Sequence, residues 1–387
     1  MIYEVAIVGL GAVGAATAYQ LARRGVRVAG FDRFDPPHGF GSSHGDTRIT
    51  RLAIGEGDHL SPIAKRSHEL WRKIESQTGA SLLMQCGGLI ISSDATAAET
   101  HVQGFFRNTV RAAEMFGIAH EVLRAEEIRA RFPQLTVRDS ERGYFESEAG
   151  FVRPEACVGA QLELARRGGA DLRMNEQVLG YATSPGGVEI TTVSGKYRAD
   201  RLILSAGAWL PQLTGGEVAK VFKVYRQVML WFDVSGAYES FTPERFPVFI
   251  WEPQNTAHGI YGFPAIDGPG GGIKVASESF AATTTPSRVD RSVSPNEVSY
   301  VFESLVAPHL HGVGSRCVRS ATCLYTVTPD FGFVIDTHPE SDRVIIASPC
   351  SGHGFKHSAA IGEALADLAT GQTPRFDLSP FRLARFG

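Results

Sequence analysis

Short apolar runs and one longer helical stretch open the chain. Residues 4–9 form an apolar run that ends in glycine, which is the pattern of a buried parallel strand. Residues 15–24 have helical composition, and Gly25 stands where it would end the helix. Residues 26–31 predict a second strand, and Asp32 follows it directly. The pattern therefore predicts a strand, a helix and a strand in one unit of about 30 residues.

Later apolar runs predict further strands of two kinds. The segment 221–280 is rich in aromatic and β-branched residues with alternating stretches, which predicts an antiparallel sheet. The segment 266–290 is dense in Gly, Ser and Thr, so we expect it to include a mobile or edge segment. The remaining predictions are strands at 171–181, 187–193, 196–203 and 343–347, and helices at 155–167 and 357–370.

A glycine-rich turn joins the first predicted strand to the first predicted helix. Gly9, Gly11 and Gly14 have the spacing GxGxxG. Gly9 permits the tight turn, Gly11 lets the backbone approach a pyrophosphate, and Gly14 lets the helix pack closely on the strand. The open N–H groups at the start of the helix would face the phosphates, and Asp32 can accept hydrogen bonds from ribose hydroxyls. The unit predicts a dinucleotide site, although it does not by itself separate NAD from FAD.

The composition is that of a globular protein and narrows its partners. Of 387 residues, 43% are hydrophobic and 20% are charged, and the length suggests two or three domains. The formal charge of −3 offers no electrostatic footprint for nucleic acid or an anionic membrane, so we expect a small-molecule partner. No apolar run approaches the roughly 18 residues that cross a bilayer. The five cysteines form neither a CxxC pair nor a disulfide framework, so we expect a cytoplasmic protein without a bound metal.

Residues 41–57 follow the predicted nucleotide site and carry two arginines. Arg48 and Arg51 are spaced i and i+3, so they would share one face if this stretch were helical. A solvated basic face is the alternative. The flanking residues are small or apolar, which favours a functional pair of cations.

Five sequence blocks are informative together: residues 35–51, 259–264 with Lys274, 323–330, 351–356 and 377–381. They resemble the corresponding blocks of the monomeric sarcosine oxidases and N-methyltryptophan oxidases, within the wider group of D-amino-acid-oxidase-like flavoproteins. The resemblance implies α/β and α+β architecture, in which a Rossmann-like FAD-binding domain is interleaved with an antiparallel-sheet substrate domain. It places the FAD-binding domain at 1–84, 145–215 and 318–387, and the substrate domain at 85–144 and 216–317.

The resemblance also implies the cofactor and its attachment. FAD would be joined through its 8α-methyl group to Cys323. By composition alone Cys323 is a buried, small hydrophobic residue, and Cys317 is its nearest competitor for the link. The other positions that correspond to cofactor-binding residues are Gly9, Gly11, Gly14, Asp32, Ser43, Gly352, Gly354, Phe355 and Lys356.

The reaction implied is oxidation of a secondary amine, with oxygen reduced to hydrogen peroxide and the imine hydrolysed. Arg51 and Lys356 would bind the substrate carboxylate and so orient the amine. Lys274 would lie beside the flavin, where its positive charge favours the reaction with oxygen. Without the resemblance, the two lysines are surface or loop residues. His44 and Arg48 would lie near the flavin ring, and Tyr261 and Tyr325 would line the substrate pocket, where core packing is the alternative for both tyrosines.

Three departures from the family pattern lie in or near the expected pocket. Glu278 stands four residues after Lys274, where sarcosine oxidases carry a histidine, and Ile54 replaces a tyrosine. The glycine-rich segment before Lys274 is longer. These changes put sarcosine itself in doubt, and a carboxylate at 278 would favour a substrate side chain that is cationic or donates hydrogen bonds, unless it only faces solvent.

The leading hypothesis is therefore a monomeric FAD-dependent oxidase of an N-methyl or other secondary amino acid, with oxygen as the acceptor and neither nucleic acid nor membrane as partner. A second hypothesis is a flavin dehydrogenase, or an oxidase of a primary or cyclic amino acid. A third, of another class, is an FAD-binding module without catalysis. The presence of Arg51, Lys274, Cys323 and Lys356 together favours an enzyme.

Overall fold

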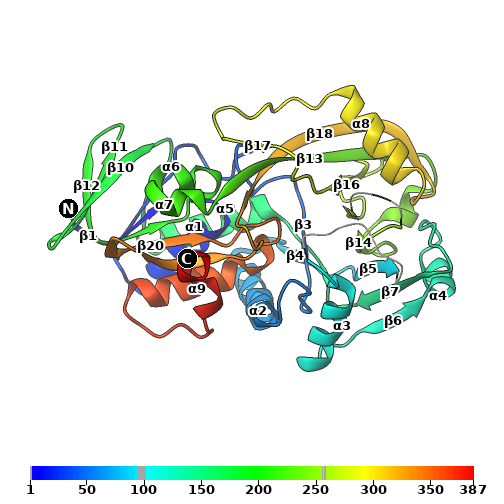
Figure 1. Ribbon diagram of the computed structural model, residues 1–387, viewed down its shortest axis with the longest axis horizontal. Coiled ribbons are helices and arrows are strands. Elements are labelled where there is room, and N and C mark those ends of the chain that lie inside the picture. The colour runs from blue at the N-terminus through cyan, green and yellow to red at the C-terminus, as the bar shows by residue number, and fades with distance from the viewer. Residues whose placement is uncertain (1, 94–101, 255, 257–258) are drawn as a thin grey trace.

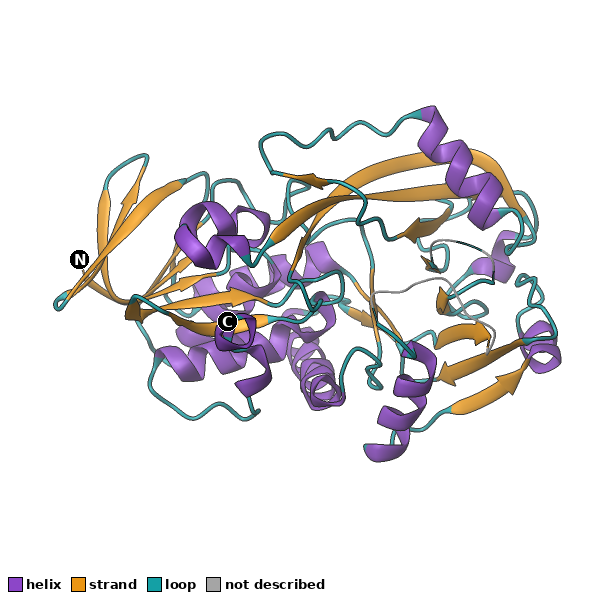
Figure 2. Cartoon of the chain, viewed as in Figure 1, coloured by secondary structure: helices purple, strands orange, loops and turns teal. Residues whose placement is uncertain are grey.

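Two large sheets lie beside one another, with strands of a small third sheet between them (Figure 1). The computed structural model describes residues 2–93, 102–254, 256 and 259–387. Within these ranges, no helix combines the length and the apolar character that crossing a membrane requires. The longer helices gather around the first sheet, whereas the second half is dominated by strands (Figure 2).

Eight strands of the described chain form the first sheet. They are β1 (Ile2–Val8), β2 (Val28–Phe31), β9 (Asp171–Arg173), β10 (Val178–Ser184), β11 (Gly187–Thr192), β12 (Lys196–Leu204), β19 (Val334–His338) and β20 (Ser341–Ser348). The order is β10-β11-β12-β1-β2-β9, and β20 pairs with both β12 and β19. β9, β2, β1, β12 and β20 run parallel, so their carboxyl ends meet at one edge, where sheets of this kind bind ligands.

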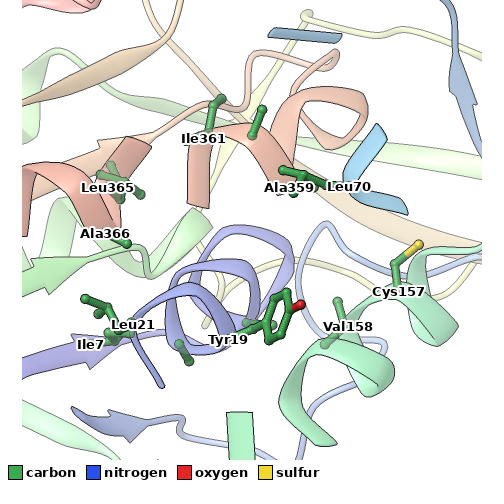
Figure 3. Packing of buried hydrophobic residues seen from close by; sticks show 14 of the residues in the cluster. Ile7, Tyr19, Leu21, Leu70, Cys157, Val158, Ala359, Ile361, Leu365 and Ala366 are labelled. Atoms are coloured by element: carbon green, nitrogen blue, oxygen red, sulfur yellow. The ribbon is translucent and has the colours of Figure 1, made fainter. Parts of the chain in front are cut away.

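Helices cover one face of this sheet and bury a shared apolar cluster (Figure 3). They are α1 (Ala12–Ala22), α2 (Ser61–Thr78), α5 (Pro154–Arg167) and α9 (Ser358–Ala369). Ile7 of β1, Tyr19 of α1 and Leu365 of α9 belong to the cluster. α1 and α9 pack closely because both carry small residues: a Cβ on Gly362 would lie 2.4 Å from the Cβ of Ala16. This packing holds the start of α1 at the carboxyl edge of the sheet.

The elements predicted for this half agree with the structure, with one exception. The strands predicted at 4–9 and 26–31 and the helix at 15–24 are β1, β2 and α1. The single strand predicted at 171–181 is wrong: the chain forms two strands, β9 and β10. Asn175 between them has a φ of 56°, a left-handed conformation that asparagine tolerates and that interrupts an extended strand.

Short helices cover the other face of the first sheet and connect the remaining elements. α6 (Leu210–Thr214) and α7 (Gly216–Lys220) contribute apolar residues to the cluster on that face. Single turns of 3-10 helix occur at Asp58–Leu60, Gly207–Trp209, Tyr238–Phe241, Phe355–His357, Ser379–Phe381 and Leu383–Phe386, and a short π-helix occurs at Phe302–Val306.

Nine strands within the described ranges form the second sheet, which is antiparallel except where β14 meets β5. They are β5 (Gly88–Ser93), β6 (Glu121–Arg124), β7 (Glu141–Glu146), β13 (Lys223–Val234), β14 (Val248–Trp251), β15 (Ile260–Gly262), β16 (Ile273–Ser277), β17 (Thr283–Thr284) and β18 (Val313–Val327). Its order is β17-β13-β16-β15-β14-β5-β7-β6, and β18 pairs with β13. The antiparallel sheet predicted for 221–280 is confirmed. The helices of this half are α3 (Phe105–Met115), α4 (Ala125–Arg131) and α8 (Pro295–Val301).

The glycine-rich segment 266–290 contributes both to the edge and to the interior of the second sheet. β17 is an edge strand, as expected, and it pairs with the N-terminal end of β13. β16 instead pairs with strands on both sides, β13 and β15. Lys274 therefore stands on a central strand rather than on a flexible loop. The domain boundaries given above stay a prediction.

Three short strands of the described residues form the third sheet, in which β8 (Gly150–Val152) lies between β3 (Arg48–Thr50) and β4 (Leu83–Met84). A helical stretch that places Arg48 and Arg51 on one face is therefore excluded. Residues three apart along an extended chain project to opposite sides. The two arginines accordingly serve two different clusters of polar groups, described below.

Candidate active site

A deep cleft follows the carboxyl ends of β1, β2, β12 and β20. Its volume is about 1440 Å³ when the part that is open to solvent is included. Of the predicted site residues, those that line it are Gly9, Gly11, Asp32, Ser43, Arg48, Tyr325, Gly352, Gly354 and Phe355. The cleft thus connects the glycine-rich turn with the second sheet.

Two glycines of the first turn, Gly9 and Gly14, leave no space for a side chain. Gly9 has a φ of 92°, and a Cβ there would lie 2.6 Å from the carbonyl oxygen of Ser205. A Cβ on Gly14 would lie 1.8 Å from the carbonyl oxygen of Gly9. Gly354, in the loop before α9, shows the same close approach, at 1.6 Å from the carbonyl oxygen of Pro349. Both strand–turn–helix units are therefore built for close backbone packing at the cleft.

Polar groups of the cleft are partly engaged with the protein backbone. The Asp32 carboxylate accepts from the backbone N–H of Leu10 at 2.8 Å and of Phe34 at 2.9 Å. The Ser43 hydroxyl accepts from the N–H of Ala12, at the start of α1, at 3.2 Å. The hydroxyls of Ser348 and Ser358 line the cleft, are buried, and have no hydrogen-bond partner within the described chain. A polar ligand in the cleft would satisfy them.

Lys274 and Arg48, which lines the cleft, both donate to the turn at residues 45–47. The Lys274 ammonium is buried and donates to the carbonyl oxygens of Gly45 at 2.7 Å and Thr47 at 2.6 Å. The Arg48 guanidinium donates to the same Thr47 oxygen at 2.9 Å and to that of Ser42 at 2.8 Å. Burial and the charge of Arg48 hold the pKa of Lys274 well below its usual range.

His44 is buried beside the same arginine. Burial and the charge of Arg48 lower the pKa of His44 to about 3. Its imidazole is therefore neutral near pH 7. Its Nε2 has no hydrogen-bond partner within the described ranges, so it is available to a ligand.

Arg51 and Lys356 meet at one buried carboxylate, that of Glu56. The Arg51 guanidinium lies 2.5 Å from Glu56, and the Lys356 ammonium lies 3.4 Å from it and donates to the carbonyl oxygen of His353 at 2.8 Å. The exposed fractions of the three side chains are 3%, 6% and 6% for Arg51, Lys356 and Glu56. Burial lowers the pKa of Lys356 to about 8, although the charge of Glu56 opposes this shift. The predicted pair of carboxylate-binding cations thus converges on a carboxylate.

Tyr261 and Tyr325 come together from β15 and β18, with their hydroxyls 3.3 Å apart. Glu278 directly follows β16. Side chains alternate along a strand, and Glu278 is four residues after Lys274, so both side chains project from the same face. A Cβ on Gly352 would lie 2.9 Å from the Glu278 carboxylate and 2.8 Å from the ring of Tyr325. Burial raises the pKa of both tyrosines, and the charge of Glu278 adds to the shift. Glu278 therefore faces the pocket side of the structure.

Cys323 is buried on β18, with an exposed fraction of 1%. The next residue, Leu324, is hydrogen-bonded to the loop that contains Gly41 and Ser42 at the cleft. The N–H of Leu324 donates to the carbonyl oxygen of Gly41 at 3.4 Å, and the Ser42 hydroxyl donates to the carbonyl oxygen of Leu324. Burial raises the pKa of the Cys323 thiol, whereas the charges of Arg48 and Lys274 lower it. Cys317 lies farther along β18, where its thiol contacts the carbonyl oxygen of Arg319.

The sequence prediction missed three residues of this region. Glu56 lies within the segment that carries Arg51, but one acid among loop residues gives no signal of its burial. Cys350 lines the cleft, so it is a second competitor of Cys323. Glu155, at the start of α5, accepts from the backbone of the turn that holds Lys274. The contact of Glu155 with this turn joins residues more than 100 positions apart, so no local pattern could predict it.

The chain belongs to the FAD-dependent oxidoreductase family, whose model matches residues 4–368. It is 40% identical to the monomeric sarcosine oxidase of Streptomyces avermitilis, over 99% of this chain and 98% of the relative. It is 35% identical to the N-methyl-L-tryptophan oxidase of Salmonella heidelberg over the full length of both. The solved structure of NikD, an unusual amino acid oxidase essential for nikkomycin biosynthesis, has a TM-score of 0.83, with 25% identity over 98% of this chain and 97% of that one.

The cleft fits the cofactor of this family. Gly9 and Gly11 of the glycine turn line it, and the buried hydroxyls of Ser348 and Ser358 and the Nε2 of His44, which have no partner within the described residues, offer polar contacts. The expectations of an FAD-dependent oxidoreductase and of its mixed α/β and antiparallel architecture are thus confirmed.

Proposed function

We propose that this protein is an FAD-dependent oxidase of an N-methyl or other secondary amino acid. The observation that carries the proposal is the convergence of Arg51 and Lys356 on one buried point, the Glu56 carboxylate. Two buried cations suit a small carboxylate, because charge-assisted hydrogen bonds are strong where water is excluded. The curated relatives support the class of substrate, since their names specify sarcosine and N-methyl-L-tryptophan.

In this proposal the chain's own residues bind and orient the amino acid. The substrate carboxylate takes the place of Glu56 between Arg51 and Lys356, and the walls formed by Tyr261 and Tyr325 enclose the amine. Bound FAD would supply an acceptor for the hydride from the carbon beside the amine nitrogen and would return both electrons to oxygen as hydrogen peroxide. Loss of the hydride would leave the substrate as an imine, which water would hydrolyse. Fixed positive charge at Lys274 and Arg48 stabilises negative charge that develops during these steps.

The test is a panel of amino acids read by hydrogen peroxide release. We expect peroxide with N-methylated amino acids, and formaldehyde where an N-methyl group is oxidised. Oxygen consumption that matches peroxide supports an oxidase, whereas turnover only with an artificial electron acceptor supports a dehydrogenase. A yellow, folded protein that is inert towards all secondary amino acids would contradict the proposal.

We further propose that the flavin is attached to Cys323. A thioether to the 8α carbon would replace one C–H bond of that methyl group, whose hydrogen would leave as a proton, and the two electrons left on the flavin would pass to oxygen. The attack requires a thiolate, and the charges of Arg48 and Lys274 favour that form against the effect of burial. Mass spectrometry of the denatured protein should show added flavin mass in the wild type, in Cys317→Ala and in Cys350→Ala, but not in Cys323→Ala. Loss of the added mass in Cys350→Ala alone would assign the link to that residue instead.

Glu278 is proposed to set the substrate side chain. Its carboxylate lies against Gly352 and Tyr325, so a substrate side chain that reaches it would gain from a positive charge. We expect kcat/KM for α-N-methyllysine to exceed that for N-methyl-2-aminoheptanoic acid, its neutral match in length, by about tenfold or more. Glu278→Gln should remove this preference and leave the neutral substrate little affected. An equal loss of kcat/KM for both substrates would show that Glu278 does not discriminate between substrate side chains.

We propose a cytoplasmic monomer as well. All five cysteines are unpaired thiols, which suits a reducing compartment. Size-exclusion chromatography with light scattering would check the mass against 41.8 kDa.

A further inference from the structure

The turn at residues 45–47 lies between a carboxylate and an ammonium group. The Glu155 carboxylate accepts from the backbone N–H of Gly45 at 2.5 Å and of Asp46 at 3.2 Å. On the other side, the Lys274 ammonium donates to the carbonyl oxygens of Gly45 and Thr47. The peptide groups of one short turn therefore connect an acid on α5 with a lysine on β16.

This arrangement polarises the turn in the direction that favours both charges. A carboxylate on the N–H groups and a cation on the carbonyl oxygens each form charge-assisted hydrogen bonds, and each strengthens the other through the peptide dipoles. Glu155 is in the first turn of α5, where the helix N-terminus stabilises a negative charge. The turn is thereby held firmly against Lys274.

Burial and the charge of Arg48 oppose a positive charge on Lys274, so the groups that favour this charge matter. The Lys274 side chain is 2% exposed, and Arg48 of β3 repels its charge. Cys323 of β18 and the faces of the Phe263 and Trp231 rings favour the charge, with the Phe263 ring centre 4.0 Å from the ammonium. Burial and Arg48 lower the pKa of Lys274, and Glu155 is first among the groups that raise it.

We propose that Glu155 is a positioning residue that holds Lys274 in place and keeps it positively charged for the reaction with oxygen. The inference rests on the proposed function, in which Lys274 serves that reaction. Glu155 acts through the turn and through its charge, and it touches neither substrate nor oxygen in this role.

Asp46 provides a matched control in the same turn. The Asp46 carboxylate forms an ion pair with Arg319, whose side chain is 46% exposed. The acid of Asp46 therefore lies on the solvent side of the turn. Asp46 has a φ of 65°, a conformation that asparagine tolerates as well. Asp46→Asn therefore removes an acid from the turn without removing the contact to Lys274.

The direct test is the titration of Lys274 in the oxidised holoenzyme by NMR of ¹³C-labelled lysine, with Lys274→Met assigning the signal. We expect Glu155→Gln to move the titration to lower pH by about one unit or more, the effect of removing an opposite charge at close range. Glu155→Asp keeps the negative charge and should shift the titration to lower pH less than Glu155→Gln does. Asp46→Asn should leave the titration of Lys274 unchanged. In rapid kinetics, the loss of reoxidation by oxygen at high pH should move to lower pH by the same amount in Glu155→Gln.

The outcomes separate this inference from the function on which it rests. An unchanged Lys274 titration in Glu155→Gln would overturn the role of Glu155, and so would an equal shift in Asp46→Asn. If Glu155→Gln does not fold, a titration of Glu155→Asp that is identical to wild type overturns it, and a downward shift supports it. Fast reoxidation in Lys274→Met would instead contradict the proposed role of Lys274 itself.

Discussion

Lys274→Met is expected to slow the reaction of the reduced enzyme with oxygen by about a hundredfold or more, the scale seen when one fixed electrostatic group is removed. Methionine fills a similar volume beside Phe263 and Trp231 but carries neither the charge nor the hydrogen bonds to the turn at 45–47. Negative charge that develops on oxygen would then lack its buried counter-charge. Reduction by substrate should change much less, because the carboxylate anchors are elsewhere.

Stopped-flow kinetics separates the two half-reactions. The variant is first reduced by substrate without oxygen, and the recovery of flavin absorbance is then followed after mixing with aerated buffer. Lys274→Arg serves as the control, since it retains the charge and should retain part of the rate. Equal slowing of both half-reactions in Lys274→Met would indicate general disruption of the site and would contradict the specific role.

Arg51→Met and Lys356→Met are each expected to lower kcat/KM by about a hundredfold or more, mainly through KM. Each change removes one of the two cations that would hold the substrate carboxylate, and loss of a buried charged partner costs about 2–5 kcal/mol. The measurement is steady-state kinetics across the best substrates of the panel. A secondary amine without a carboxylate is the control, since its weak turnover should not change.

A change at Glu56 is expected to have the opposite effect on KM. Its carboxylate occupies the point where Arg51 and Lys356 converge, so it competes with the substrate. Glu56→Gln is expected to lower KM, because both cations then lack a charged partner in the free enzyme. A rise in KM would show instead that Glu56 is needed to arrange the anchors, and that the substrate carboxylate binds elsewhere.

The pH dependence of kcat/KM follows from Lys356. Burial lowers its pKa to about 8, so the charged form that binds a carboxylate is lost as the pH rises through that value. We therefore expect kcat/KM to fall above about pH 8, and this limb should be absent in Lys356→Met. A high-pH limb that persists unchanged in this variant would assign it to another group.

The local pattern was sufficient to predict much of the fold. Residues 4–31 formed the expected strand, helix and strand because one short segment contains the turn glycines, the helix formers and the apolar runs. The single strand at 171–181 was wrong because Asn175 adopts a left-handed conformation that no apolar pattern reveals. Lys274 lies on a central strand, although a glycine-rich stretch precedes it, since pairing on both sides is a tertiary property.

Individual residues of the candidate site could be predicted only where they lie in sequence blocks that resemble the family. The separation of Arg48 and Arg51 into two clusters follows from the extended chain of β3, which the i and i+3 spacing did not indicate. The contacts of Glu56 with Lys356 and of Glu155 with Gly45 join residues 300 and 110 positions apart. Such contacts depend on how the two sheets and the helices pack, so no local pattern contains them.

Anaerobic mixing of the purified holoenzyme with N-methylated amino acids tests the central claim most directly. We predict that at least one of them bleaches the flavin absorbance in a single saturable reaction, and that admitting oxygen restores the colour with one equivalent of hydrogen peroxide. A holoenzyme that keeps its oxidised spectrum with every secondary amino acid of a broad panel would contradict the assignment of this site to amino acid oxidation.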